Sequence, residues 1–184
     1  MIKRKPNRLR DYDYSRDGYY FVTVCTRGRK EFFGDIREAK IDLNRYGEIV
    51  NQCWRDLPRH YSNCSLDSFV IMPNHIHGII VIDNGNVVGN GLKPFPTHGL
   101  PEIVRGFKTF SSRRINEEIK MDNKSQWQKS FYDHIIRDDK SLENLRQYII
   151  YNSLKWEWDV ENRTSVPNLA KSCKDYYEEI INGR

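Results

Sequence analysis

Residues 72–80 read MPNHIHGII, and two histidines stand two positions apart inside this otherwise apolar stretch. Side chains on a strand alternate between its faces, so His75 and His77 point to one face and Ile76 points to the other. The histidine face continues through Ile79, which predicts a partly desolvated pair at the end of an apolar strip. This spacing suits two nitrogen ligands of one divalent metal, or a clamp on one phosphate. The alternative is two imidazoles satisfied by backbone carbonyls near a turn.

The segments around this stretch predict the rest of a small sheet and its helices. β-branched and aromatic runs predict strands at 18–26, 66–73, 75–83 and 127–136, with a turn at Pro73-Asn74. Apolar residues at helical spacing predict helices at 44–58, 100–120 and 140–156, with Pro58 ending the first, and residues 31–44 predict a short hairpin through Gly34-Asp35. The order of these elements favours an α+β domain: a ferredoxin- or RRM-like antiparallel sheet with helices packed on one face.

The chain of 184 residues is long enough for one domain with its own core. We expect residues 1–17 to form a basic arm, 18–158 the domain, and 159–184 a tail with one amphipathic helix. The expected packing residues of that helix are Tyr176, Tyr177, Ile180 and Ile181. No apolar run approaches the length of a membrane span and the first residues do not resemble a signal peptide, so we expect a soluble, cytoplasmic protein.

The charge of the chain favours a phosphate-bearing partner. The net charge is +5, and five cations stand near the start without an acid: Lys3, Arg4, Lys5, Arg8 and Arg10. A second, more diluted group lies in the helix predicted at 100–120: Arg105, Lys108, Arg113 and Arg114. Both groups suit contacts to a nucleic-acid backbone, although a solvated tail explains the first group equally well. The scattered cysteines form no CxxC pair, so neither a zinc knuckle nor a disulfide framework is indicated.

The helix predicted at 140–156 offers partners for the histidines. Tyr148 and Asn152 stand four residues apart and therefore lie together on one flank of its buried stripe. A carboxamide oxygen can bind a metal and a phenol can act as a nucleophile. The alternative is two half-buried polar residues at a helix boundary.

Taken together, these motifs resemble a known family. MPNHIHGII resembles the His-hydrophobic-His motif of the HUH nuclease superfamily, and the Tyr148–Asn152 pair resembles the catalytic helix of its single-tyrosine transposases. The closer match is to the REP-associated tyrosine transposases, whose other blocks are similar to RLRDYDYSRDGYYFVTVCTRGRKEFFG and WQKSFYDHIIRDDKSLENLRQYIIYNSLKW. The three blocks agree in order and spacing over residues 8–156.

The resemblance implies an HUH endonuclease fold and a metal-dependent enzyme that nicks and rejoins single-stranded DNA near hairpins. It implies that His75, His77 and Asn152 bind Mg²⁺ or Mn²⁺, which polarises an oxygen of the scissile phosphate. It implies that Tyr148 attacks the phosphorus, giving a 5′-phosphotyrosine and a free 3′-OH. The implied partner is single-stranded DNA with a REP-like hairpin, whose backbone the two basic groups would contact.

Some alternatives stay open. A non-catalytic protein that binds single-stranded DNA or hairpins is the second hypothesis, and an RNA-recognition protein is disfavoured because the RNP aromatic pattern is absent. Family members often carry proline after the asparagine; here Ser153 follows Asn152, and we expect the helix to continue. His134 is either a DNA contact or a structural residue on its strand, and the structural role is favoured. The protein is either a monomer or a homodimer in which the tyrosine helix serves the partner's histidines.

Overall fold

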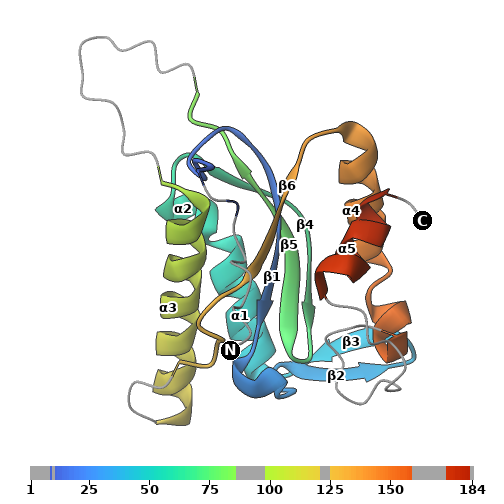
Figure 1. The fold of residues 1–184 in the computed structure, drawn as a ribbon. Coiled ribbons are helices and arrows are strands. Elements are labelled where there is room, and N and C mark those ends of the chain that lie inside the picture. The colour runs from blue at the N-terminus through green and yellow to red at the C-terminus, as the bar shows by residue number, and fades with distance from the viewer. Residues whose placement is uncertain (1–8, 10, 86–97, 121–124, 159–172, 183–184) are drawn as a thin grey trace, which may run out of the picture.

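The structure is a computed structural model, which describes residues 9, 11–85, 98–120, 125–158 and 173–182. Its centre is a four-stranded sheet in the order β4-β5-β1-β6, in which every neighbouring pair is antiparallel (Figure 1). The strands are β1 (Gly18–Cys25), β4 (Cys64–Met72), β5 (His75–Ile82) and β6 (Tyr132–Ile136). The α+β class and the antiparallel sheet predicted from the sequence are confirmed.

The register of the sheet places the histidines in its middle. Strand β5 lies between β4 and β1, so both of its edges are hydrogen-bonded to neighbours. His77 stands opposite Thr23 of β1 and Val70 of β4, and His75 stands opposite Cys25 and Met72. The turn at Pro73-Asn74 joins β4 to β5, as the sequence predicts. Both imidazoles are therefore held by a central strand.

Helices cover both faces of the sheet, and the prediction of helices on one face was wrong. Helices α1 (Arg45–Arg55), α2 (Leu57–His60) and α3 (Leu100–Ile119) cover one face, and α4 (Asp139–Ile150) and α5 (Cys173–Asn182) cover the other (Figure 1). Alternating residues of β1 explain the arrangement: Val22 packs in the core under α1 and α3, whereas Phe21 packs in the core under α4 and α5. A strand buried on both faces reads as a continuous apolar run, which hides the alternation that would identify one covered face.

Three predicted boundaries differ from the structure. The hairpin of β2 (Gly34–Arg37) and β3 (Lys40–Leu43) turns at Glu38-Ala39, which both have positive φ, as a two-residue hairpin requires. Gly34 instead starts β2, because a Cβ there would collide with the backbone of β3. Pro58 lies in the first turn of α2, where a missing N–H is tolerated. The fourth strand is shorter than predicted, and Trp127 forms only an isolated bridge with Thr26.

The C-terminal part confirms one expectation and corrects another. Helix α4 ends at Ile150, and a 3₁₀ segment, η2 (Ser153–Trp158), follows, so the predicted continuation of the helix to residue 156 was wrong. Helix α5 confirms a helix in the tail, with Tyr177 and Ile181 buried. The arm residues Lys3, Arg4, Lys5, Arg8 and Arg10 and most of 159–184 lie outside the described residues. Within the described part, no helix is both long and apolar enough to cross a bilayer.

Candidate active site

The two histidines converge on one point inside the protein. Both side chains are fully buried, and Nε2 of His75 lies 2.9 Å from Nε2 of His77. Each Nδ1 is held by a neighbouring side chain: Asn74 Oδ1 lies 2.7 Å from Nδ1 of His75, and Thr23 Oγ1 lies 3.0 Å from Nδ1 of His77. The same-face pair predicted from strand alternation is present in the structure.

The hydrogen bond at Nδ1 of His75 fixes which of its two nitrogens carries the proton. An amide oxygen only accepts, so Nδ1 of His75 donates to Asn74 and its Nε2 keeps a lone pair. The amide of Asn74 is oriented by its own Nδ2, which donates to the carbonyl of Arg29 at 3.4 Å. Holding the outer nitrogen of an imidazole in this way is how proteins orient metal-binding histidines.

The spacing of the Nε2 atoms fits a shared cation. Adjacent ligands of an octahedral ion with bonds of about 2.1 Å lie about 3.0 Å apart, close to the observed 2.9 Å. Among the described residues, no group of three or more His, Cys, Asp or Glu side chains gathers at one point. Within this described part, a further protein ligand at the pair would be an amide, a carbonyl or a hydroxyl oxygen, and Mg²⁺ and Mn²⁺ accept such oxygen ligands.

Tyr148 meets the histidine pair within the same chain. Its hydroxyl lies 3.0 Å from Nε2 of His77, and only 6% of the residue is exposed. The phenol ring lies 5.1 Å from the imidazole of His77 and 6.3 Å from the ring of Phe21, measured between centroids. The tyrosine predicted as a nucleophile and the histidines predicted as ligands thus come together, 71 residues apart in the sequence.

Asn152 lies beyond the helix that carries Tyr148. It is fully buried, and its backbone N–H donates to the carbonyl of Ile149. The residues on its two sides contact one imidazole each: Tyr148 contacts His77, and Trp156 stacks on His75 with centroids 6.0 Å apart. Asn152 is therefore placed along a segment that passes over the pair, in a bend after α4 rather than on the helix flank that the sequence predicted.

An ion pair fastens the helix of Tyr148 to the sheet. Arg146 donates through Nε and Nη2 to the two carboxylate oxygens of Asp67, at 3.0 and 2.6 Å. Asp67 lies where the register of β4 shifts between Leu66 and Phe69. A bulge adds one residue to a strand and re-aims a side chain, which explains how a charged group of β4 reaches α4.

Helix α5 covers the site from outside. The ring of Tyr177 is fully buried and contacts His77, Tyr148 and Tyr132 at centroid distances of 5.7, 6.1 and 4.8 Å. The sequence indicated Tyr177 only as a packing residue, since nothing local shows what a tail helix covers. Thr23 and Asn74 were also missed; the position of Asn74 beside His75 was the one available signal.

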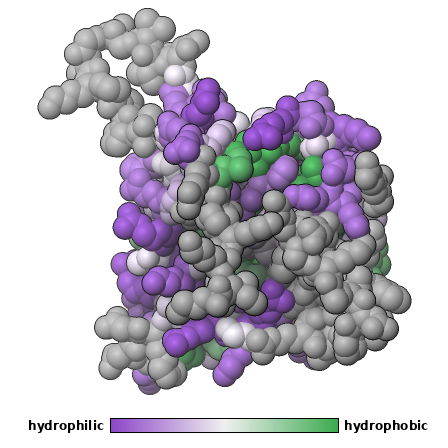
Figure 2. Space-filling model, in the orientation of Figure 1, coloured by the Kyte–Doolittle hydropathy of each residue, from purple (hydrophilic) through white to green (hydrophobic). Residues whose placement is uncertain are grey.

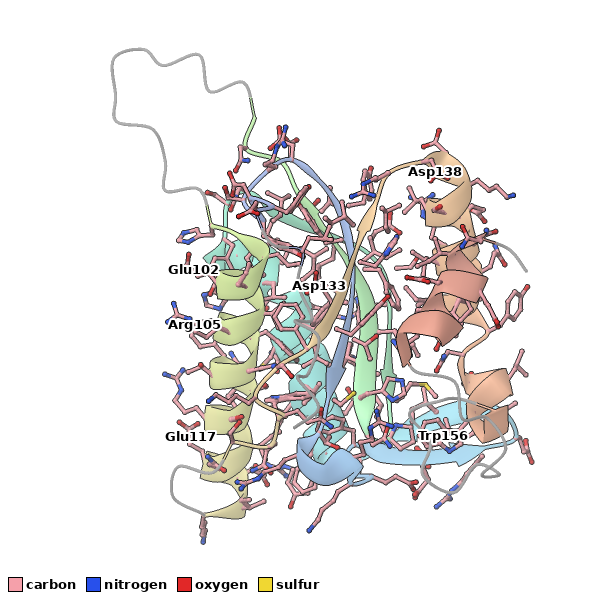
Figure 3. The ribbon with its side chains drawn as sticks, in the orientation of Figure 1. Glu102, Arg105, Glu117, Asp133, Asp138 and Trp156 are labelled. Atoms are coloured by element: carbon pink, nitrogen blue, oxygen red, sulfur yellow. The ribbon has the colours of Figure 1, made fainter. Side chains whose placement is uncertain are left out.

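The predicted basic group on α3 lies on the other side of the sheet from the histidines. Its arginines pair with acids: Arg105 with Glu102, Arg113 with Glu117, and Arg114 with Asp56. Lys108 donates to the carbonyls of Gln128 and Ser130. Figure 3 shows Glu102, Arg105 and Glu117 along α3, far from Trp156, and Figure 2 shows a hydrophilic outer side on this helix. The structure therefore does not bring these cations to the site.

His134 has the surroundings of a structural residue. It stands opposite Phe21 on the sheet, and burial lowers the pKa of its imidazole, with Arg137 adding to the effect. A neutral imidazole on edge strand β6 agrees with the structural role expected from the sequence.

The chain is similar in sequence to known proteins. A sequence profile of the family described as "Transposase IS200 like" matches residues 15–152. An uncharacterized protein of Haemophilus influenzae is 38% identical over 169 residues, covering 85% of this chain and 91% of the relative. Another protein of that organism, assigned as a REP-associated tyrosine transposase, is 28% identical over 147 residues, covering 78% and 74%.

A solved structure shares the fold. It is a REP-associated tyrosine transposase bound to a REP hairpin, with a TM-score of 0.58 and 21% identity, and the match covers 83% of this chain and 75% of that one. The profile spans both histidines, Tyr148 and Asn152, so the match covers the whole candidate site. The chain therefore belongs to the IS200-like transposase family.

Proposed function

We propose that this protein is a metal-dependent endonuclease and transposase that nicks and rejoins single-stranded DNA near hairpins through a 5′-phosphotyrosine. One observation carries the proposal: in a single chain, the hydroxyl of Tyr148 lies 3.0 Å from the Nε2 atom that the histidine pair directs inward. A packing role explains the burial of these groups but not the convergence of a phenol and two imidazole Nε2 atoms on one point.

Three residues would hold the metal. His75 and His77 supply Nε2 atoms at the spacing of adjacent ligands, and Asn152 is the proposed third ligand through its amide oxygen. Bound Mg²⁺ or Mn²⁺ supplies a positive charge that polarises a non-bridging oxygen of the scissile phosphate. Thr23 and Asn74 keep the imidazoles turned inward, so the pair does not have to reorganise on binding.

Tyr148 is the proposed nucleophile. Its hydroxyl is hydrogen-bonded to Nε2 of His77, the atom that would bind the cation, so the phenol would lose this partner and be available to the phosphate in the loaded site. A bond forms between the phenol oxygen and phosphorus while the bond between phosphorus and the 3′ oxygen breaks. The phenol loses one proton and the 3′ oxygen gains one, which gives the free 3′-OH. Reversing these steps with another 3′-OH rejoins the strands.

The structure supports a self-contained site. Tyr148 reaches His77 in its own chain, and the ion pair between Arg146 and Asp67 fastens its helix to the same sheet. We therefore propose that one chain can carry out the reaction as a monomer. His75 and His77 are fully buried and contact Trp156 and Tyr177, so DNA binding would require the cover over the pair to shift.

The proposed partner is single-stranded DNA that carries a REP-like hairpin. The solved relative is bound to a REP hairpin, and a curated relative is assigned as a REP-associated transposase. Family membership and the positive net charge of the chain point in the same direction.

The direct test is a covalent adduct. The protein is incubated with hairpin-bearing single-stranded DNA and Mn²⁺ or Mg²⁺, and an SDS-stable protein–DNA species is sought on a denaturing gel. Wild type and Tyr151→Phe, a matched control at an exposed phenol, should form the adduct, whereas Tyr148→Phe and samples with EDTA should not. An adduct in Tyr148→Phe would disprove the assigned nucleophile. Hairpin binding with no adduct under any metal would favour a non-catalytic DNA-binding protein.

A further inference from the structure

A basic loop follows β1 directly at the histidine end of the sheet. Residues 26–30 read TRGRK, so Arg27, Arg29 and Lys30 bring three cations into four positions, and the exposed Glu31 follows. Arg27 and Lys30 are exposed, and within the described residues neither forms an ion pair. These charges therefore differ from the arginines of α3, which acids already neutralise.

Hydrogen bonds attach this loop to the turn that precedes His75. The backbone N–H of Thr26 donates to the carbonyl of Asn74 at 2.8 Å, which continues the pairing of Cys25 with His75 by one residue. The hydroxyl of Thr26 donates to the carbonyl of Lys30 at 2.8 Å and closes the loop. In Figure 1 the loop lies at the lower end of the sheet, next to the β4–β5 turn.

The backbone of the loop makes a tight reversal. Gly28 and Arg29 both have positive φ, at 72° and 53°. Glycine adopts this conformation without strain, and a second residue in it is held by its surroundings. The backbone N–H of Arg29 donates to the carbonyl of Thr26 at 2.9 Å, and its carbonyl accepts from Asn74 Nδ2 at 3.4 Å.

Asn74 thereby links the loop to the metal site. Its Oδ1 orients His75 while its Nδ2 holds the carbonyl of Arg29, so the loop and the imidazole are fixed by one side chain. We propose that the loop Thr26–Lys30 binds backbone phosphates of the DNA strand that is cut, next to the scissile phosphate. This inference rests on the proposed function, because it takes its ligand from that reaction.

The chemistry of the loop selects phosphates rather than bases. Guanidinium and ammonium groups pair with phosphate oxygens without reading sequence, and they position the strand. An aromatic side chain, which would stack a base, is absent from residues 26–30. The loop therefore suits a strand whose sequence is read elsewhere and whose backbone must be aligned here.

Salt dependence of binding separates this loop from α3. Each phosphate contact on a single strand adds about 0.7 to the slope of log Kd against log salt concentration. Arg27→Ala/Lys30→Ala should therefore lower the slope by about 1.4. When NaCl is raised from about 50 to about 200 mM, the factor by which binding weakens should then be about seven times smaller in this variant than in wild type. Arg105→Ala/Arg113→Ala removes the same charge from α3 and is the matched control, with an unchanged slope.

The measurement is fluorescence anisotropy with a labelled hairpin carrying a single-stranded flank, at several NaCl concentrations and without metal. Circular dichroism checks that each variant is folded. An unchanged slope in Arg27→Ala/Lys30→Ala, or a lowered slope only in the α3 variant, would overturn the inference. The adduct assay stands apart: a lowered slope with no adduct in wild type supports the loop as a phosphate site and rejects the nuclease.

Discussion

Replacing Thr23 with valine tests whether the Thr23 hydroxyl orients the imidazole of His77 so that its Nε2 points toward His75. Thr23 is 1% exposed and stands opposite His77 in the register, with Oγ1 at 3.0 Å from Nδ1. Valine keeps the shape of the side chain and removes the hydroxyl. The change therefore removes one buried hydrogen bond without opening a cavity.

The substitution should affect both the stability of the protein and its affinity for the metal. Loss of the partner of a buried polar group costs about 1–3 kcal/mol, and a chain of this length loses roughly 2–4 °C in Tm per kcal/mol. We expect Tm to fall by about 2–12 °C. Loss of a group that orients a metal-binding imidazole lowers metal affinity about 10–100-fold, and we expect that loss for Mn²⁺.

Two measurements check the argument. Calorimetry gives the change in Tm, and a Mn²⁺ titration followed by electron paramagnetic resonance gives the affinity. Thr23→Ser keeps the hydroxyl and should bind Mn²⁺ nearly as wild type does. If Thr23→Val binds Mn²⁺ as tightly as wild type, the hydroxyl does not orient a metal ligand, whatever happens to Tm, and the reasoning is refuted.

Two further predictions concern packing and charge around the site. Gly78→Ala should lower stability by about 1–3 kcal/mol, because a Cβ there would stand 2.5 Å from Cζ2 of the fully buried Trp54. Thermal unfolding measures the loss, and an unchanged Tm would contradict the packing argument. Asp67→Asn should remove a stabilisation of up to about 1 kcal/mol at neutral pH. The hydrogen bonds from Arg146 hold the pKa of Asp67 below its ordinary 3.8, so this stabilisation exists above that pH and is lost as the pH falls through the lowered pKa. Urea unfolding across this range checks it, and a deficit that persists unchanged in acid would show that the charge is not the cause.

Local pattern predicted the parts of the site that lie within one element. Strand alternation placed His75 and His77 on one face, and the structure has them 2.9 Å apart at Nε2. Helical spacing placed Tyr148 on one flank of the buried stripe of its helix, and the structure buries it. Both conclusions need only the backbone period of a strand or a helix, which neighbouring residues set by themselves.

The same reasoning was less accurate at the ends of elements. Helix α4 stops at Ile150, although the apolar spacing continues to Trp156. Beyond this end the chain follows the site, and Trp156 stacks on His75 of another element. Residue spacing along the helix carries no information about such a partner.

The sequence by itself determined the strands, the helices, the paired histidines and the tyrosine that could act with them. Only the tertiary structure decided that Tyr148 meets His77 in the same chain, that α3 lies on the opposite face, and that the loop Thr26–Lys30 adjoins His75. The physical reason is distance along the chain. Periodicity comes from neighbouring peptide units, whereas strand register and the choice of face come from burying apolar surface between residues far apart in sequence.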